Sequence, residues 1–152
     1  MPAGPIRQGK RTTMSVSTPG RGARPNPCLS CGACCARFRC SFHWSEADDA
    51  TPGGVPVALT ENLTVHRRVM RGTNSAQPRC MALAGTIGEQ VRCTIHAQRP
   101  STCRAFPASY SNGAPNERCD AARAAIGLPP LTPADWERPV DEPPKPTRPV
   151  RP

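Results

Sequence analysis

Eight of the nine cysteines have a spacing that predicts metal binding. Four stand in one short run, C-x2-C-G-x-C-C, and four follow singly along the chain. Thiolates separated by two residues on a tight loop can bind one ion together, and a glycine between them permits a turn that a residue with a Cβ resists. The predicted ligands are Cys28, Cys31, Cys34, Cys35, Cys80, Cys93, Cys103 and Cys119.

Eight thiolates suit zinc (Zn2+) or iron. They divide into two tetrahedral sites of four sulfurs, the closed geometry of structural zinc, in which Cys34 and Cys35 face different ions or bridge them. The spacing C-x2-C-x2-C also opens ferredoxin-like sequences, so an iron–sulfur protein with a [4Fe-4S] cluster and a redox role is the alternative. A closed site has no open position for water or substrate, which favours chelation over hydrolytic catalysis.

Two further side chains lie close to this set in the sequence. Cys40 occupies an apolar position of an alternating segment, which favours a small buried residue over a ligand. His96 follows Cys93 at a C-x2-H spacing that permits ligation. We therefore predict eight ligands, with Cys40 left over and His96 as a weaker candidate.

The apolar content of the chain is small. Leu, Ile, Val and Phe supply 21 of 152 residues, below the level at which a chain normally buries enough apolar surface to fold. Structural zinc contributes about 10–16 kcal/mol in small peptides, on the scale of the stability of a whole domain. We therefore expect metal to stabilise the fold and the metal-free chain to be largely unfolded.

The cysteines are expected to remain reduced. Residues 1–26 contain no apolar run of the length that a secretory signal needs, and no later stretch approaches the roughly 18 apolar residues of a membrane span. The sequence thus predicts a cytoplasmic protein with no membrane partner, where close cysteines hold metal more often than they form disulfides.

Composition divides the chain into three segments. Residues 1–26 predict a disordered basic arm, residues 27–128 the cysteine-cluster domain, and residues 129–152 a Pro/Arg-rich tail that is also disordered. The tail contains a PxxP sequence at Pro146 to Pro149, which resembles a polyproline ligand but is also common in solvated tails.

The net charge of +9 does not by itself indicate a nucleic-acid partner. Five of the basic residues lie in the N-terminal arm, and aromatic residues for base stacking are scarce, so any such binding is expected to be weak and confined to the arm. Residues 28–128 hold 11 arginines against 7 acids, an excess that eight thiolates with two divalent ions would balance. Six of these arginines lie near cysteines and are predicted to donate to sulfur: Arg37, Arg39, Arg79, Arg92, Arg104 and Arg118.

The elements that must position the first cysteines are short. Apolar residues alternate from Phe38 to Trp44, which predicts a half-buried strand. Residues 59–70 show apolar positions near helical spacing and predict a helix. Residues 79–83 and 90–95 flank a glycine-containing loop and predict a hairpin with Cys80 on one arm and Cys93 on the other.

Helix starts are predicted for the last two cysteines. Pro100 suits the first turn of a helix that ends before Pro107 and contains Cys103, and Asn116 suits the cap of a helix that runs to Gly127 with Cys119 at its third position. A capped turn is predicted from Thr132, with Trp136 folding back on the domain. Together these elements predict a small α+β, loop-rich, metal-stabilised domain.

Several motifs in this order resemble the YkgJ-like cysteine-cluster family, which is described as a zinc- or iron-chelating domain. After the cysteine run come C-x-A-L from Cys80, C-x-I-H from Cys93 and R-P-x-x-C-R-x-F-P from Arg99, followed by Cys119. The resemblance covers about residues 27–128. It implies a bacterial, cytoplasmic, single-domain metal-binding protein with no assigned reaction. Similar domains occur in flagellin lysine methylases, which links the cluster alternative to S-adenosylmethionine chemistry.

Overall fold

A computed structural model describes residues 26–137 of the chain. The predicted disorder of residues 1–25 and 138–152, including the PxxP sequence, lies outside the described residues. None of the helices between residues 26 and 137 has the length and apolar character that crossing a bilayer requires.

A three-stranded antiparallel sheet forms one end of the fold. Its strands are β1 (Ser41–His43), β2 (Thr60–Thr64) and β3 (Arg67–Met70), in the order β1-β3-β2. The predicted strand from Phe38 to Trp44 is confirmed at its centre, where Phe42 is buried; it is shorter than predicted because Trp44 begins a 3-10 turn.

The prediction of a helix over residues 59–70 is wrong. Strands β2 and β3 form a hairpin there, with Thr60 opposite Met70 and Glu61 opposite Val69. Val69 and Met70 are fully buried, whereas Val65 at the turn is 89% exposed. Packing of β-branched and apolar side chains onto the core thus outweighs the approximate helical spacing.

A second hairpin carries part of the cysteine set. Strands β4 (Leu83–Thr86) and β5 (Gln90–Cys93) pair in register, with Leu83 opposite Cys93, so the predicted hairpin is confirmed. The prediction that Cys80 lies on the first arm is wrong. Cys80 lies before β4 and its carbonyl accepts a hydrogen bond from Leu83 N at 3.0 Å, which places it in the turn that leads into the arm.

Residues 26–137 also contain three short α-helices: α1 (Cys28–Cys31), α2 (Ser101–Arg104) and α3 (Glu117–Ala124). The Asn116 cap is confirmed, because its side chain accepts hydrogen bonds from the backbone N–H groups of Arg118 and Cys119. The capped turn at Thr132 is confirmed too, and Trp136 donates to Ser109 O at 2.9 Å.

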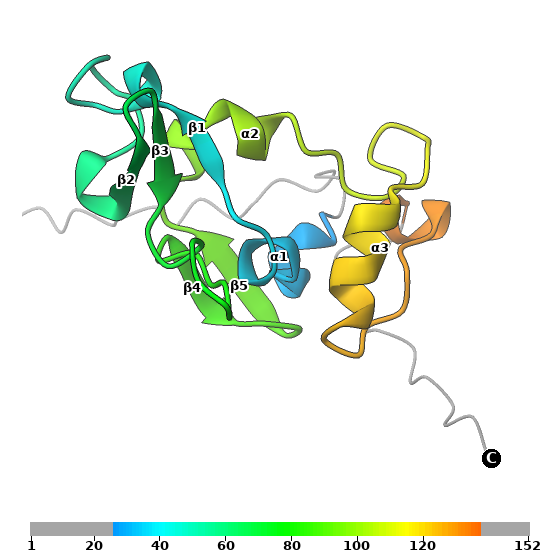
Figure 1. Cartoon of the computed structure of the whole chain (residues 1–152). Coiled ribbons are helices and arrows are strands. Elements are labelled where there is room, and N and C mark those ends of the chain that lie inside the picture. The colour runs from blue at the N-terminus through cyan, green and yellow to red at the C-terminus, as the bar shows by residue number, and fades with distance from the viewer. Residues whose placement is uncertain (1–25, 138–152) are drawn as a thin grey trace, which may run out of the picture.

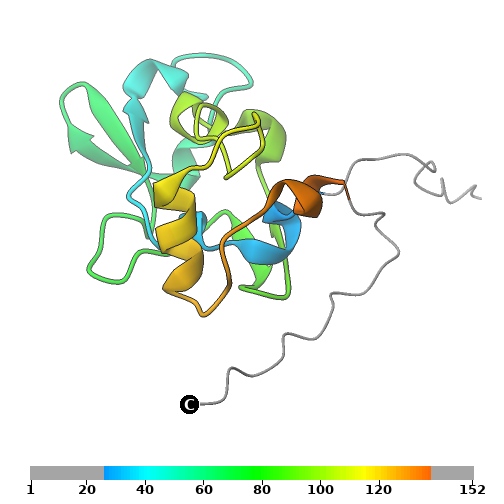
Figure 2. The same cartoon turned by 90° about the vertical axis from the view of Figure 1, so that its right-hand side faces the viewer.

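Helix α1 lies between the β4–β5 hairpin and α3, while α2 lies beside β1 (Figure 1). Turning the molecule brings α3 and the last described turn into the foreground, with α1 behind them (Figure 2). The architecture is a small α+β fold with antiparallel sheets. Its core is divided into three small clusters, and cysteines take part in all of them.

Candidate metal centre

Four cysteines gather on the side of the molecule nearest α3. Cys31 is buried with Ala33 and Ala122, and Cys34 packs against this cluster. Cys34 also packs against the neighbouring cluster that contains buried Cys119. We call Cys28, Cys31, Cys34 and Cys119 the first thiol group.

The electrostatic neighbours of Cys34 and Cys28 define the same group. Burial raises the pKa of Cys34, and negative charge on Cys119, Cys31 and Cys28 raises that pKa further. Burial raises the pKa of Cys28 to about 11, with Cys119 and Cys31 adding to the shift. Repulsion between neighbouring thiolates raises these pKa values. A bound cation would offset that repulsion and stabilise the thiolate form.

Local backbone structure explains how this group forms. One turn of α1 places Cys28 and Cys31 three residues apart on one face of the helix. Gly32 ends the helix in the left-handed region, at φ 69°, and redirects the chain into the 3-10 turn Cys34–Ala36. Cys119 is the third residue of α3, where its N–H donates to the Asn116 cap.

The remaining cysteines gather near the sheets and α2. Cys40, Cys80 and Cys93 pack against the core cluster that contains Phe42 and Ile95. Cys35 O accepts a hydrogen bond from Cys80 N at 2.9 Å. Cys103, in α2, reaches this group through Cys40, whose Sγ lies 3.2 Å from Cys103 Sγ. We call Cys35, Cys40, Cys80, Cys93 and Cys103 the second thiol group.

Charge interactions within the second group are also mutual. Burial raises the pKa of Cys35 to about 12, and charge on Cys80, Cys103 and Cys93 contributes to that rise. Burial likewise raises the pKa values of Cys80 and Cys93, to which Cys103 adds. Among the charge contributions, the larger ones link Cys34 with Cys119 and Cys31, and Cys35 with Cys80 and Cys103. Smaller contributions, of Cys35 to the pKa of Cys34 and of Cys28 to the pKa of Cys35, connect the two thiol groups.

Cys40 has a neighbour that sequence reasoning missed. It packs against the core as predicted, yet its sulfur is in contact with Cys103. This contact raises the pKa of Cys40 and lowers that of Cys103, and either sulfur can be the donor. The only signal in the sequence was its inward position in the Phe38–Trp44 alternation, five residues after Cys35.

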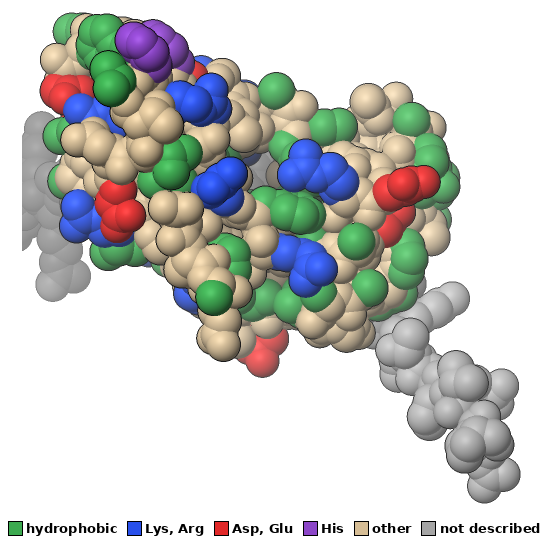
Figure 3. Space-filling view, viewed as in Figure 1, with side chains coloured by type: hydrophobic (Ala, Val, Ile, Leu, Met, Phe, Trp, Pro, Cys, Tyr) green, Lys and Arg blue, Asp and Glu red, His purple; other side chains and the backbone are tan. Residues whose placement is uncertain are grey.

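His96 and two of the predicted arginine donors make their contacts with groups other than sulfur. His96 is exposed in the 3-10 turn His96–Gln98, and its carbonyl accepts from Arg99 Nε at 3.0 Å. Arg118 stacks over Phe38, 4.7 Å from the ring centroid, and Arg104 donates to Arg99 O. The charge of Arg104 adds to the lowering of the pKa of Cys103 that the contact with Cys40 causes, whereas Arg118 packs on the rings of Phe38 and Phe106. Basic side chains are spread over the visible face rather than gathered into one patch (Figure 3).

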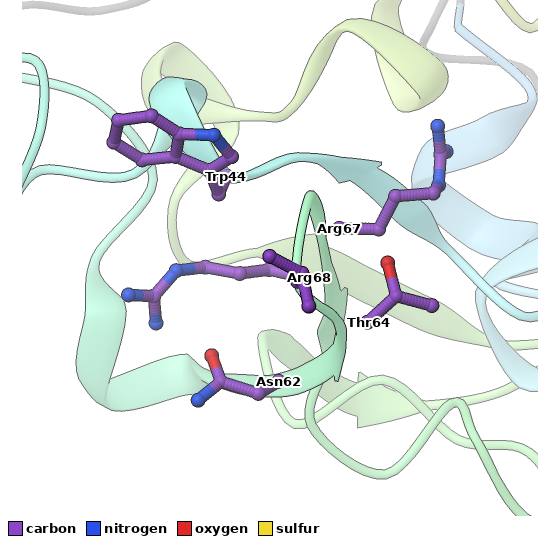
Figure 4. A pocket seen from close by; sticks show the side chains of 6 residues that line it. Trp44, Asn62, Thr64, Arg67 and Arg68 are labelled. Carbon is purple, nitrogen blue, oxygen red and sulfur yellow. The ribbon is translucent and has the colours of Figure 1, made fainter.

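Within residues 26–137, no three Cys, His, Asp or Glu side chains are gathered closely enough to hold an ion as they stand. A hollow lies on the β2–β3 hairpin, and its lining contains no cysteine (Figure 4). It is formed by Trp44, Asn62, Thr64, Val65, Arg67 and Arg68.

Comparison with known sequences identifies the family. Residues 27–121 match the family described as "CxxCxxCC: Putative zinc- or iron-chelating domain". The chain belongs to this family. It is 57% identical over 106 residues to "Uncharacterized protein YkgJ" of Escherichia coli O157:H7, covering 70% of this chain and 96% of the relative. It is 46% identical over 122 residues to a "Putative ferredoxin" of Acinetobacter calcoaceticus, covering 78% and 92%. No solved structure matches.

Because the chain belongs to a metal-chelating family, the number of protons that its cysteines release on binding metal is informative. Five of the predicted ligands have raised pKa values and are protonated near pH 7 without metal: Cys28, Cys34, Cys35, Cys80 and Cys93. Thiolates are the form that binds metal, so binding must release these protons and weaken as the pH falls.

We therefore expect metal binding at pH 7 to release at least five protons per chain, and the apparent affinity to fall steeply on acidification. Calorimetric titration in buffers of different ionisation enthalpy measures the number directly. Release of close to no protons would mean that the thiols are already ionised and that burial does not control them.

Gly32 is the position in the family's cysteine run where a side chain should do most harm. An added Cβ would lie 3.1 Å from Val91 Cγ1, and φ of 69° disfavours any L-residue. We expect Gly32→Ala to destabilise the metal-loaded protein by about 1–2 kcal/mol or more and to speed metal loss to a chelator. Gly53→Ala is the matched control, because Gly53 has φ of 78° with nothing within 4 Å of the added Cβ. Equal metal retention in both variants would contradict this role.

Proposed function

We propose that this chain is a cytoplasmic metal-binding protein that holds two ions of zinc or iron. The first ion would be bound by Cys28, Cys31, Cys34 and Cys119, and the second by Cys35, Cys80, Cys93 and Cys103. The observation that supports this proposal is that Cys34 and Cys35 differ in their packing and in the cysteines that contribute most to their pKa values.

The donor set suits the ions. Four sulfurs complete a tetrahedral site, and a bound cation offsets the repulsion between thiolates that raises the pKa of Cys34 and Cys35. Binding would require the cysteine side chains to move, because no three such side chains within residues 26–137 lie close enough to hold an ion as they stand. Two such sites carry −4 in total, which matches the excess of 11 arginines over 7 acids in residues 28–128.

The role that follows is structural chelation. Both ions would tie segments far apart in sequence: the first ties α1 to α3, and the second ties Cys35 to the β4–β5 hairpin and α2. A bound ion would supply the stability that the small, divided core lacks. Sites filled by four protein sulfurs leave no position for a substrate, so the proposal includes no catalytic step.

An iron–sulfur cluster is the second candidate, favoured by the relative whose name is "Putative ferredoxin". Four cysteine thiolates hold a [4Fe-4S] cluster, and either thiol group supplies that number. The two candidates differ in colour and in sulfide content.

Elemental analysis and an absorption spectrum of the full chain, purified without oxygen, separate them. Colourless protein with two zinc ions per chain supports paired sulfur sites. Brown protein with inorganic sulfide selects the cluster. Reduced protein that retains no metal would overturn both.

A further inference from the structure

We propose that Cys40 and Cys103 form a redox pair, which a hydroperoxide oxidises to a disulfide, and that this bond releases the ion of the second thiol group. The inference rests on the proposed function, because Cys103 is one of the four ligands proposed for that ion. It assigns a task to Cys40, the one cysteine that the two sites do not use.

The two sulfurs are placed together by their backbones. Their separation is 3.2 Å although 63 residues lie between the two positions in sequence. Residues adjacent to the two cysteines hold α2 against β1, because Thr102 Oγ1 donates to Ser41 O at 2.7 Å. In Figure 1, α2 accordingly lies beside β1.

Each member of the pair is also fixed from its other side. Cys40 N donates to Thr73 Oγ1 at 3.1 Å, and Cys40 O accepts from Met70 N at 2.9 Å. The start of α2 is held by Glu46, whose carboxylate accepts from Ser101 N and Ser101 Oγ at 2.6 and 2.8 Å. The sulfurs are therefore held within reach of each other, and forming a bond between them needs little movement.

The second thiol group contains one sulfur more than a tetrahedral ion uses. Cys40 is the surplus sulfur, and its neighbour Cys103 is a proposed ligand. A thiol in contact with a metal-bound thiolate is poised to compete with the metal for that sulfur when an oxidant is present.

A small oxidant can reach this pair. Cys40 and Cys103 are both half-buried, and the residues on either side of Cys103, Thr102 and Arg104, are exposed. The first group has an exposed cysteine as well, Cys28, so the contact between Cys40 Sγ and Cys103 Sγ, and not exposure, is what favours oxidation at the second ion. Oxidation is therefore expected to affect the second ion selectively.

The step balances with a hydroperoxide as oxidant. The Cys103 thiolate attacks one peroxide oxygen, the O–O bond breaks, and the Cys40 thiol gives its proton to the departing oxygen, which leaves as water. Cys103 is now a sulfenic acid. The Cys40 thiolate attacks its sulfur, the S–O bond breaks and hydroxide leaves. The two thiols lose two electrons to the peroxide, and the disulfide sulfur no longer binds the ion as a thiolate.

The experiment uses the full chain, purified reduced and loaded with zinc, and treated with hydrogen peroxide. Released zinc is followed with a chromogenic chelator, and tandem mass spectrometry identifies the linked peptides after free thiols are alkylated. We expect the wild type to lose half of its zinc as the Cys40–Cys103 bond forms. Cys40→Ser and Cys40→Ala are both expected to hold two ions before treatment and to keep the second ion through the same exposure.

Equal zinc loss from wild type and both variants, or a disulfide that joins other cysteines first, would overturn the inference while leaving metal binding intact. Absence of zinc from the reduced, untreated wild type would instead overturn the proposed function. In that case the peptide map still reports whether Cys40 and Cys103 pair.

Discussion

Removing the metal from the reduced protein is expected to abolish the folded state of residues 26–137. Within residues 26–137, five of the fifteen buried apolar residues are alanines, among them Ala33, Ala47 and Ala122. The core is split into three clusters, of which two share Cys34. Structural zinc supplies about 10–16 kcal/mol, which equals or exceeds the net stability of about 5–15 kcal/mol that ordinary domains possess. Without both ions, the remaining interactions therefore supply too little favourable free energy to offset the conformational entropy that the chain loses on folding.

Circular dichroism and tryptophan fluorescence measure this loss of folded structure during titration with a strong chelator under reducing conditions. Trp136 is a useful probe because its indole N–H donates to Ser109 O in the folded state. The same chelator already saturated with zinc serves as the control, and added metal should restore both signals. A metal-free chain that keeps its native spectrum and melts cooperatively would contradict the expectation.

Single serine substitutions are expected to remove one ion and leave the other. Cys119→Ser opens the first site and should release α3, whereas Cys80→Ser opens the second and should loosen the β4–β5 hairpin. Either change is expected to lower the metal content from two ions to one, because the two thiol groups share no sulfur. Cys40→Ser is the matched control and should retain both ions.

Metal content per chain, combined with hydrogen exchange of the two regions, tests this division. Exchange should rise in α3 for Cys119→Ser and in residues 80–93 for Cys80→Ser. The exchange pattern also distinguishes local opening from general unfolding. If each single change empties both sites equally, the eight thiolates form one joined cluster, and the division into two groups is wrong.

Local features of the fold were predictable because neighbouring residues determine them. The left-handed turn at Gly32, the Asn116 cap and the capped turn from Thr132 depend on side chains within three residues of the backbone groups they satisfy. The β4–β5 hairpin was predictable for the same reason. By contrast, residues 59–70 carry an ambiguous apolar pattern, and the partner strand β1 that favours a hairpin lies more than a dozen residues away.

The candidate site was predictable in its members but not in their grouping. The run from Cys28 to Cys35 indicates thiolate chemistry by spacing alone. Nothing in that run tells which later cysteine joins which part of it. Cys119 reaches the first group through α3, and Cys103 reaches Cys40 through a contact that spans 63 residues. Such pairings follow from tertiary packing, which local spacing does not encode.

Titration of the reduced, metal-free chain with Co²⁺, followed by absorption spectroscopy, tests the central claim most directly. Cobalt takes the place of zinc in tetrahedral sulfur sites, and sulfur-to-metal charge transfer reports thiolate ligation. Two sites of four thiolates predict that the tetrahedral and charge-transfer bands grow together and saturate at two ions per chain. Saturation at one ion, or a spectrum without thiolate bands, would contradict the two-site account.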